Sequence, residues 1–141
     1  MTPHELRLRR VEGFRKIASE ELSAAKLLSG EHRPQAAYFL QQTVEKLARG
    51  VLEIDDIPVG PTHQIHQLSR MMSGREELAS RFAKLDELSS AATKFRYPGP
   101  TGQVSDISAQ RLTYLMSEVE KLNADVAAVL SEFLNKGTSN A

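Results

Sequence analysis

The most regularly spaced polar residues in the sequence are Gln42, Glu45, Lys46 and Arg49. Residues three and four apart are neighbours on one helix face, so Gln42, Glu45 and Arg49 form a polar stripe. One interpretation is a solvent-exposed face with an i,i+4 ion pair between Glu45 and Arg49, which is a common arrangement. The other is a polar rim around a ligand pocket. The residue types alone favour the exposed face.

A second cluster is Thr62-His63-Gln64-Ile65-His66, which follows a loop rich in Pro and Gly. The free N–H groups of a helix N-terminus attract anions, and His63 would add a titratable donor there. The alternative is an ordinary capped helix with exposed imidazoles. His63 and His66 are spaced to face one metal ion, but neither Cys nor a carboxylate cluster supplies further ligands. We therefore predict no metal site.

The third cluster is Phe95-Arg96-Tyr97-Pro98. An Arg beside an aromatic residue can bind a phosphate while the ring stacks on a base. Equally, Tyr97 could pack inward while Pro98 ends the helix. A fourth cluster is basic but is interleaved with Glu, which favours a solvated face; its members are Arg7, Arg9, Arg10, Arg15 and Lys16.

Composition excludes several classes of protein. The 141 residues contain no Cys, which excludes disulfide scaffolds, zinc ribbons and Cys nucleophiles. Lys and Arg total 18 against 18 Asp and Glu, so bulk positive charge does not predict nucleic-acid binding. We find no signal-peptide-like run and no stretch approaching the ~18 apolar residues of a membrane span. We therefore expect a cytoplasmic protein without membrane contact.

Helical periodicity extends over most of the chain and predicts the elements that position these clusters. We expect helices over residues 3–28, 34–53, 62–72, 73–95 and 105–134. The predicted helix starts are a Thr2–Glu5 capping box, Pro34, Thr62, a Ser73–Glu76 capping box, and Ser105 or Asp106. The fold class is an all-α, antiparallel four-helix up-and-down bundle with one additional short helix. Residues 1–136 form one domain, and 137–141 form a flexible tail.

The order of the motifs resembles that of HEPN domains. Residues 36–52, AAYFLQQTVEKLARGVL, resemble the second-helix motif of that family, in which an aromatic residue precedes Gln, Glu-Lys and a basic residue. Thr62-His63-x-Ile65 resembles the Thr-His-x-Leu element that follows, and Arg96-Tyr97-Pro98 resembles the family's Arg-Tyr-Pro signature. The resemblance covers about residues 6–133.

This resemblance implies a helical bundle, commonly homodimeric, and for some members nucleotide binding or a partner that is a minimal nucleotidyltransferase. Other members are metal-independent endoribonucleases with Arg, four to six residues, then His. In this sequence Thr101, Gly102 and Gln103 stand at that interval after Arg96, and no His follows His66. The resemblance therefore points to the non-ribonuclease branch, without cofactor or metal.

We predict that Lys46, Arg49 and Arg96 contact phosphate, that His63 donates a hydrogen bond, and that Tyr97 stacks on the ligand. Four residues would support this site: Gln42, Glu45, Thr62 and Pro98. Extra apolar positions and the long last helix favour a homodimer. Two alternatives stay open, an RNA-cleaving toxin of a toxin–antitoxin pair that uses His63, and a bundle that only binds other proteins.

Overall fold

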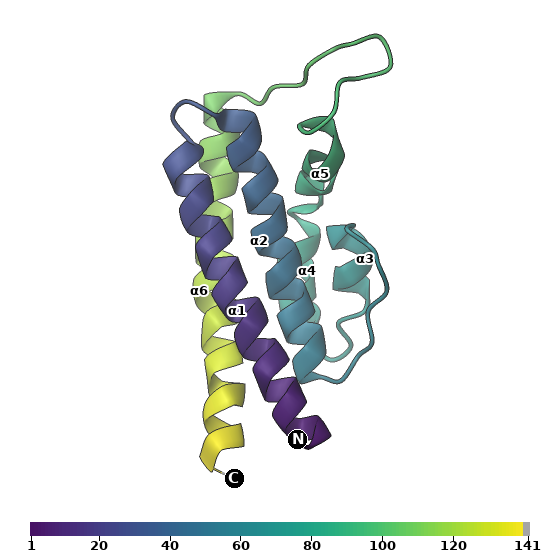
Figure 1. Cartoon of the computed structure of the whole chain (residues 1–141), viewed down its shortest axis with the longest axis vertical. Coiled ribbons are helices and arrows are strands. Elements are labelled where there is room, and N and C mark those ends of the chain that lie inside the picture. Colours follow the sequence, from purple (N-terminus) through teal and green to yellow (C-terminus); the bar gives the residue numbers. More distant parts are fainter. Residues whose placement is uncertain (140–141) are drawn as a thin grey trace.

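Three long helices form the body of the molecule. The computed structural model describes residues 1–139. In it α1 (Pro3–Leu28), α2 (Arg33–Ile54) and α6 (Ala109–Ser139) pack side by side, with α2 in contact with both of the others (Figure 1). The described residues contain no strand. The predicted all-α bundle is confirmed.

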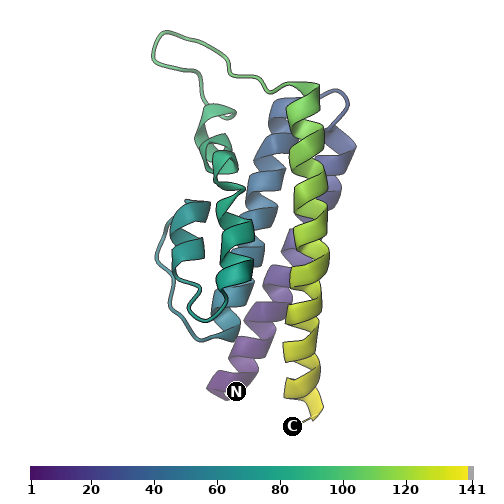
Figure 2. The same cartoon turned by 180° about the vertical axis from the view of Figure 1, so that it is seen from behind.

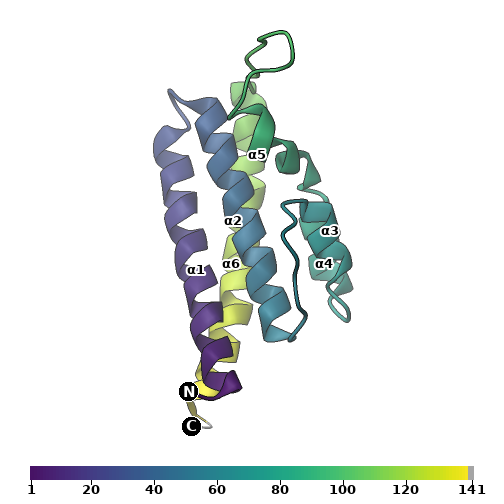
Figure 3. The ribbon, with the colours of Figure 1, turned by 45° about the vertical axis from the view of Figure 1, so that its right-hand side comes forward.

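The fourth side of the bundle is a layer of short helices that lies against α2, as seen from behind in Figure 2. The layer consists of α3 (Ile65–Arg70), α4 (Glu76–Ala83), the 3₁₀ helix η1 (Asp86–Ser90) and α5 (Ala91–Lys94). An extended segment, residues 55–64, runs beside α2 and leads into α3 (Figure 3). The polar residues of α2 therefore face protein on this side.

In α2 and α6 the core follows the predicted helical periodicity. Apolar residues at helical spacing are fully buried in α2 and α6, among them Leu40, Leu47, Leu115 and Leu122. Helix α1 starts as predicted, because Thr2 Oγ1 accepts from the Glu5 N–H (3.1 Å) and Glu5 Oε2 accepts from the Thr2 N–H (2.8 Å). Helix α2 matches its predicted limits within one residue at each end.

The prediction of one continuous helix over residues 73–95 is wrong. Helix α4 starts after Arg75 with no side-chain cap, and it ends at Ala83. Asp86 and Ser89 explain the interruption, since they accept hydrogen bonds from the first N–H groups of α3. Asp86 Oδ1 accepts from the His66 N–H (2.8 Å), and Ser89 Oγ accepts from the Ile65 N–H (2.9 Å). Such side chains stabilise turns at the expense of a regular helix.

Two other predicted helix starts need correction. Helix α3 begins at Ile65 after Gln64, and Thr62 Oγ1 instead closes a tight turn onto the Gln64 N–H (3.1 Å). Helix α6 begins at Ala109 because Ser108 Oγ accepts from the Arg111 N–H (3.1 Å). Asp106 is not the cap, since its carboxylate pairs with Arg33 at 3.1 Å.

Helix α6 continues through Ser139, three residues into the segment predicted as a flexible tail. Gly137 packs closely on Leu8 of α1, since a Cβ placed there would lie 2.5 Å from Leu8 Cδ2. Residues 140 and 141 of the predicted tail lie outside the described residues. No helix within residues 1–139 is both long enough and apolar enough to span a membrane.

Candidate functional site

A cavity of about 500 Å³ brings the predicted clusters together. Its walls come from α2, from the segment before α3, and from η1, α5 and the two residues after Phe95. In Figure 3 the segment before α3 and helix α5 lie beside α2. We call it the Arg96 cavity; its lining residues are Tyr38, Gln42, Thr62, His63, Gln64, Ser89, Ala92, Thr93, Arg96 and Tyr97.

Arg96 lies close to two aromatic rings. Its guanidinium carbon is 5.3 Å from the centre of the Tyr38 ring and 5.5 Å from the centre of the Tyr97 ring. In the described part of the chain no ion pair joins Arg96 to a carboxylate. Rings beside a guanidinium limit its motion while leaving its N–H groups available in the guanidinium plane. This side chain is well placed to bind an anion.

Tyr97 does not plug the core, which was the alternative that its position before Pro98 left open. Its side chain lies at the surface, and the residue is 59% exposed. The ring therefore contacts Arg96 on one side and remains accessible to a ligand.

Glu45 lies inside the protein, which overturns the interpretation of its helix face as solvated. Only 3% of Glu45 is exposed. Its carboxylate lies 2.6 Å from His63 Nδ1, 3.8 Å from Lys46 Nζ and 4.0 Å from Arg49 Nη2. A buried carboxylate needs such partners, because burial removes its hydration. Glu45 is thus the centre of a polar network between α2 and the segment that precedes α3.

Arg49 and Gln41 fasten that segment to α2. Arg49 Nη2 donates to the carbonyl oxygens of Thr62 (2.6 Å) and Gly60 (3.3 Å). The buried Gln41 donates from Nε2 to the carbonyl oxygen of His63 (3.2 Å). These bonds satisfy carbonyl groups of a segment that has no helical partners of its own. Arg49 is therefore a positioning residue for His63, and it does not line the cavity.

Lys46 also lies behind the cavity wall. It donates from Nζ to Gln42 Oε1 (3.0 Å) and pairs with Glu21 of α1 at 3.2 Å. Burial raises the pKa of the Glu21 carboxyl, and Lys46 only partly offsets that rise. Gln42 in turn donates to Gln41 Oε1 (2.5 Å). Lys46 therefore holds Gln42 in place, and Gln42 is the part of this chain of contacts that reaches the cavity.

Among the predicted site residues, five line the Arg96 cavity: Gln42, Thr62, His63, Arg96 and Tyr97. Lys46, Arg49 and Glu45 form the network behind it, and Pro98 follows the last lining residue. Five further lining residues were not predicted as part of the site: Tyr38, Gln64, Ser89, Ala92 and Thr93. Tyr38 precedes Gln42 by four residues and Thr93 precedes Arg96 by three, so helical spacing alone could have found both. Nothing in the pattern identified Ser89.

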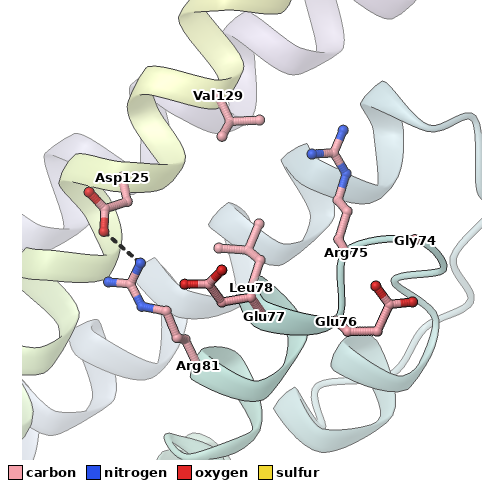
Figure 4. Close-up of a pocket in the computed structure, with 8 residues that line it drawn as sticks. All are labelled: Gly74, Arg75, Glu76, Glu77, Leu78, Arg81, Asp125 and Val129. Atoms are coloured by element: carbon pink, nitrogen blue, oxygen red, sulfur yellow. Dashed lines mark hydrogen bonds and ion pairs between the residues drawn. The ribbon is translucent and has the colours of Figure 1, made fainter.

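A second cavity, of about 370 Å³, offers a contrast. It lies between α4 and α6 and is drawn in Figure 4. Its two arginines are already paired: Arg81 with Asp125 at 2.5 Å, as the dashed line marks, and Arg75 with Asp55 at 2.6 Å. Two glutamates, Glu76 and Glu77, also line it. The Arg96 cavity, by comparison, has no Asp or Glu among its described lining residues, and its arginine has no carboxylate partner there. Of the two cavities, it is the one suited to an anion.

No group of three or more His, Cys, Asp and Glu residues gathers within residues 1–139 in an arrangement that could hold a metal ion. His63 contacts the carboxylate of Glu45, and the Nε2 of His66 lies 3.4 Å from Arg70 Nη1.

Comparison with protein families identifies the class to which this bundle belongs. The family model described as HEPN domain matches residues 11–133, which include most of the three long helices and every residue that lines the Arg96 cavity. The chain belongs to the HEPN domain family. Searches of characterised proteins and of solved structures gave no significant match.

Proposed function

We propose that this protein binds a nucleotide or another phosphorylated ligand in the Arg96 cavity. The observation that carries the proposal is the guanidinium of Arg96, which lies close to two tyrosine rings and has no carboxylate partner in the described residues. Phosphate oxygens would accept from its N–H groups. The exposed ring of Tyr97 offers a surface on which a base can stack. The hydroxyl group of Thr93 adds a further hydrogen-bonding group to the wall.

Calorimetric titration with AMP, adenosine and inorganic phosphate tests this function. We expect AMP to bind more tightly than either fragment, because it engages both Arg96 and an aromatic surface. A thermal-denaturation series should show the same order. If none of the three binds at millimolar concentration, the proposal is rejected and a bundle that binds only other proteins becomes the better interpretation.

We propose that the role is not catalytic. The ribonuclease motif suggested by the family resemblance needs a His shortly after Arg96, and that interval holds Thr101, Gly102 and Gln103 in the loop before α6. One contact favours the opposite view: His63 Nδ1 lies 2.6 Å from Glu45, as in many acid–base pairs. RNA cleavage that persists in a chelator and disappears in His63→Ala would establish the toxin alternative.

We further propose a homodimer and a nucleotidyltransferase-domain partner. Family resemblance supports both, and exposed apolar side chains on the long helices, such as Leu27 and Tyr114, support the dimer. Co-expression with a minimal nucleotidyltransferase from the same genome followed by affinity purification tests the partner. Recovery of the HEPN chain alone would argue against it.

A further inference from the structure

His63 differs from the other histidines in having a buried carboxylate behind it. The Nδ1 atom of His63 contacts Glu45, whose side chain is 4% exposed, whereas the His63 side chain is 65% exposed. Glu45 lies on the rigid α2 helix, and the backbone around His63 is held by Arg49 and Gln41. Within residues 1–139 the other ring nitrogen, Nε2, has no hydrogen-bond partner. Nε2 is therefore the atom that this ring offers to a ligand in the cavity.

What Nε2 offers depends on the charge of the ring. When Nδ1 donates its proton to Glu45, Nε2 of the neutral ring carries only a lone pair and repels a phosphate oxygen. In the protonated ring Nε2 becomes a charged donor, and Nδ1 still donates to Glu45. Binding of a fully ionised phosphate at Nε2 therefore requires the imidazolium.

The charges around His63 permit this form. On α2, Glu45 is the acceptor, and the cations Lys46 and Arg49 lie 3.8 and 4.0 Å from its carboxylate. Lys46 is itself paired with Glu21 of α1 at 3.2 Å. Across the cavity stand Arg96 and the phenols of Tyr38 and Tyr97. The direct contact with Glu45 offsets repulsion from these cations, and a bound anion offsets it further.

We propose that the Arg96 cavity selects a terminal phosphomonoester over a phosphodiester. Arg96 and the imidazolium of His63 supply two positive charges for the two negative charges of a monoester, whereas a diester carries only one. Glu45 is the positioning residue that fixes the His63 ring. This inference rests on the proposed function and adds to it a ligand class and a dependence on pH.

The direction of the pH effect follows from ordinary pKa values. Histidine has an ordinary pKa of about 6.5, and a phosphomonoester loses its second proton near pH 6. Because binding of the ionised phosphate at Nε2 uses the protonated ring, affinity for the monoester should be lower at pH 8.0 than at pH 6.5. Affinity for a diester should change less.

Calorimetry with AMP, 3′,5′-cyclic AMP and adenosine, at pH 6.5 and at pH 8.0, tests the selection. We expect AMP to bind about tenfold more tightly than cyclic AMP at pH 6.5, since one charge-assisted hydrogen bond separates them, and we expect the preference to shrink at pH 8.0. His63→Gln should remove both the preference and the pH dependence while leaving residual binding through Arg96. His66→Gln, an exposed histidine outside the cavity, is the matched control and should behave as wild type.

A second measurement does not depend on the folding of a variant. In the wild-type protein the NMR signal of the His63 ring should titrate at a higher pH when AMP is present than when it is absent.

In Glu45→Gln, affinity for AMP should begin to fall at a lower pH than in wild type, because the amide still accepts from Nδ1 but stabilises the imidazolium less.

The two proposals fail in different ways. Equal affinity for AMP and cyclic AMP at pH 6.5, or a pH dependence that survives His63→Gln, overturns phosphomonoester selection and leaves the Arg96 cavity as a general phosphate site. Absence of binding by all three compounds overturns the proposed function together with this inference.

Discussion

Arg96 owes its availability to its neighbours. Other arginines that line the cavities or approach the site hold a protein acceptor: Arg81 has Asp125, Arg75 has Asp55, and Arg49 has backbone carbonyls. Arg96 has aromatic rings instead. Because Arg96 and Tyr97 are exposed and Tyr38 is only half-buried, these contacts contribute little to folding, of the order of 0.5–1 kcal/mol. The side chain is thus free to act in recognition.

Replacing Arg96 should weaken ligand binding while leaving the stability of the fold almost unchanged. In Arg96→Ala we expect affinity for AMP to fall roughly tenfold to a hundredfold, which corresponds to loss of a charge-assisted contact of about 1.5–3 kcal/mol. The melting temperature without ligand should stay within about 2 °C of wild type, since no buried charge is stranded. Lys94→Ala removes a cation two residues away, outside the cavity lining, and serves as control. A large drop in melting temperature in Arg96→Ala alone would make Arg96 a structural residue.

Glu21, unlike Arg96, affects folding stability, since burial removes the hydration of its charged carboxylate. Its raised pKa means that the folded protein holds this proton more tightly than the unfolded chain, for which the ordinary value is 4.5. As pH rises above about 4.5, stability due to this group is progressively lost. We therefore expect the unfolding free energy of Glu21→Gln, relative to wild type, to increase between pH 4.5 and 7.5. Urea denaturation at four pH values measures this difference. A relative loss of stability over the same range would show that the pairing with Lys46 outweighs burial.

The sequence predicted which residues meet at the site better than it predicted what each one does. Spacing placed Gln42, Glu45 and Arg49 on one face, and the family resemblance joined them to His63 and Arg96. Spacing could not show that residues 55–64 would fold over that face, because an extended segment leaves no periodic signal. That one segment buries Glu45, and its backbone carbonyl groups accept hydrogen bonds from Arg49.

At the scale of elements, α2 depends on close approach to two other helices at Gly50. A Cβ at this position would lie 3.3 Å from Leu130 of α6 and 3.5 Å from Cβ of Phe14 in α1. A glycine inside a helix normally costs up to about 1 kcal/mol relative to Ala, so its presence here reflects the space that the three helices leave.

Gly50→Val should therefore destabilise the protein by about 1–3 kcal/mol, since a branched side chain overpacks the place where α1, α2 and α6 meet. Chemical denaturation measures the loss. Gly30→Val is the control, because a Cβ at Gly30 would have no atom within 4 Å and the φ of Gly30 is not positive. Equal effects of the two substitutions would show that helix propensity and loop conformation, and not packing, govern both sites.

The long helices and the helix predicted over residues 73–95 differ in how well the sequence predicted their limits. Helices α1 and α2 carry apolar residues at helical spacing together with clear start signals, and they were predicted within one residue. The stripe through Phe82, Leu85 and Leu88 is equally regular and equally buried. A 3₁₀ turn preserves such a stripe while it changes the hydrogen bonds, so periodicity did not reveal the break. The partners of Asp86 and Ser89 are 20 and 24 residues away, beyond any local pattern.

At the scale of the whole molecule, several large apolar side chains stand on the outside. Leu27 of α1 is 88% exposed, and Ile17, Tyr114 and Val104 are exposed as well. Burial of such side chains between two copies of the chain would stabilise a dimer. We expect light scattering at micromolar concentration to give twice the 15.7 kDa of one chain. Leu27→Glu should shift the equilibrium toward the monomer if Leu27 lies in the interface. A monomeric wild-type protein would refute the dimer.

The helix predicted over residues 73–95 is divided into α4, η1 and α5, which have eight, five and four residues. This division has a consequence for the time-dependent behaviour of the site. Short helices leave many amides without internal partners and open locally at low free-energy cost. In hydrogen–deuterium exchange, amides of residues 84–97 should therefore exchange well before those of residues 36–52. We therefore expect one wall of the Arg96 cavity to open and close in solution while the α2 wall stays fixed. A bound ligand would hold the mobile wall closed, so the exchange that it slows should lie in η1 and α5.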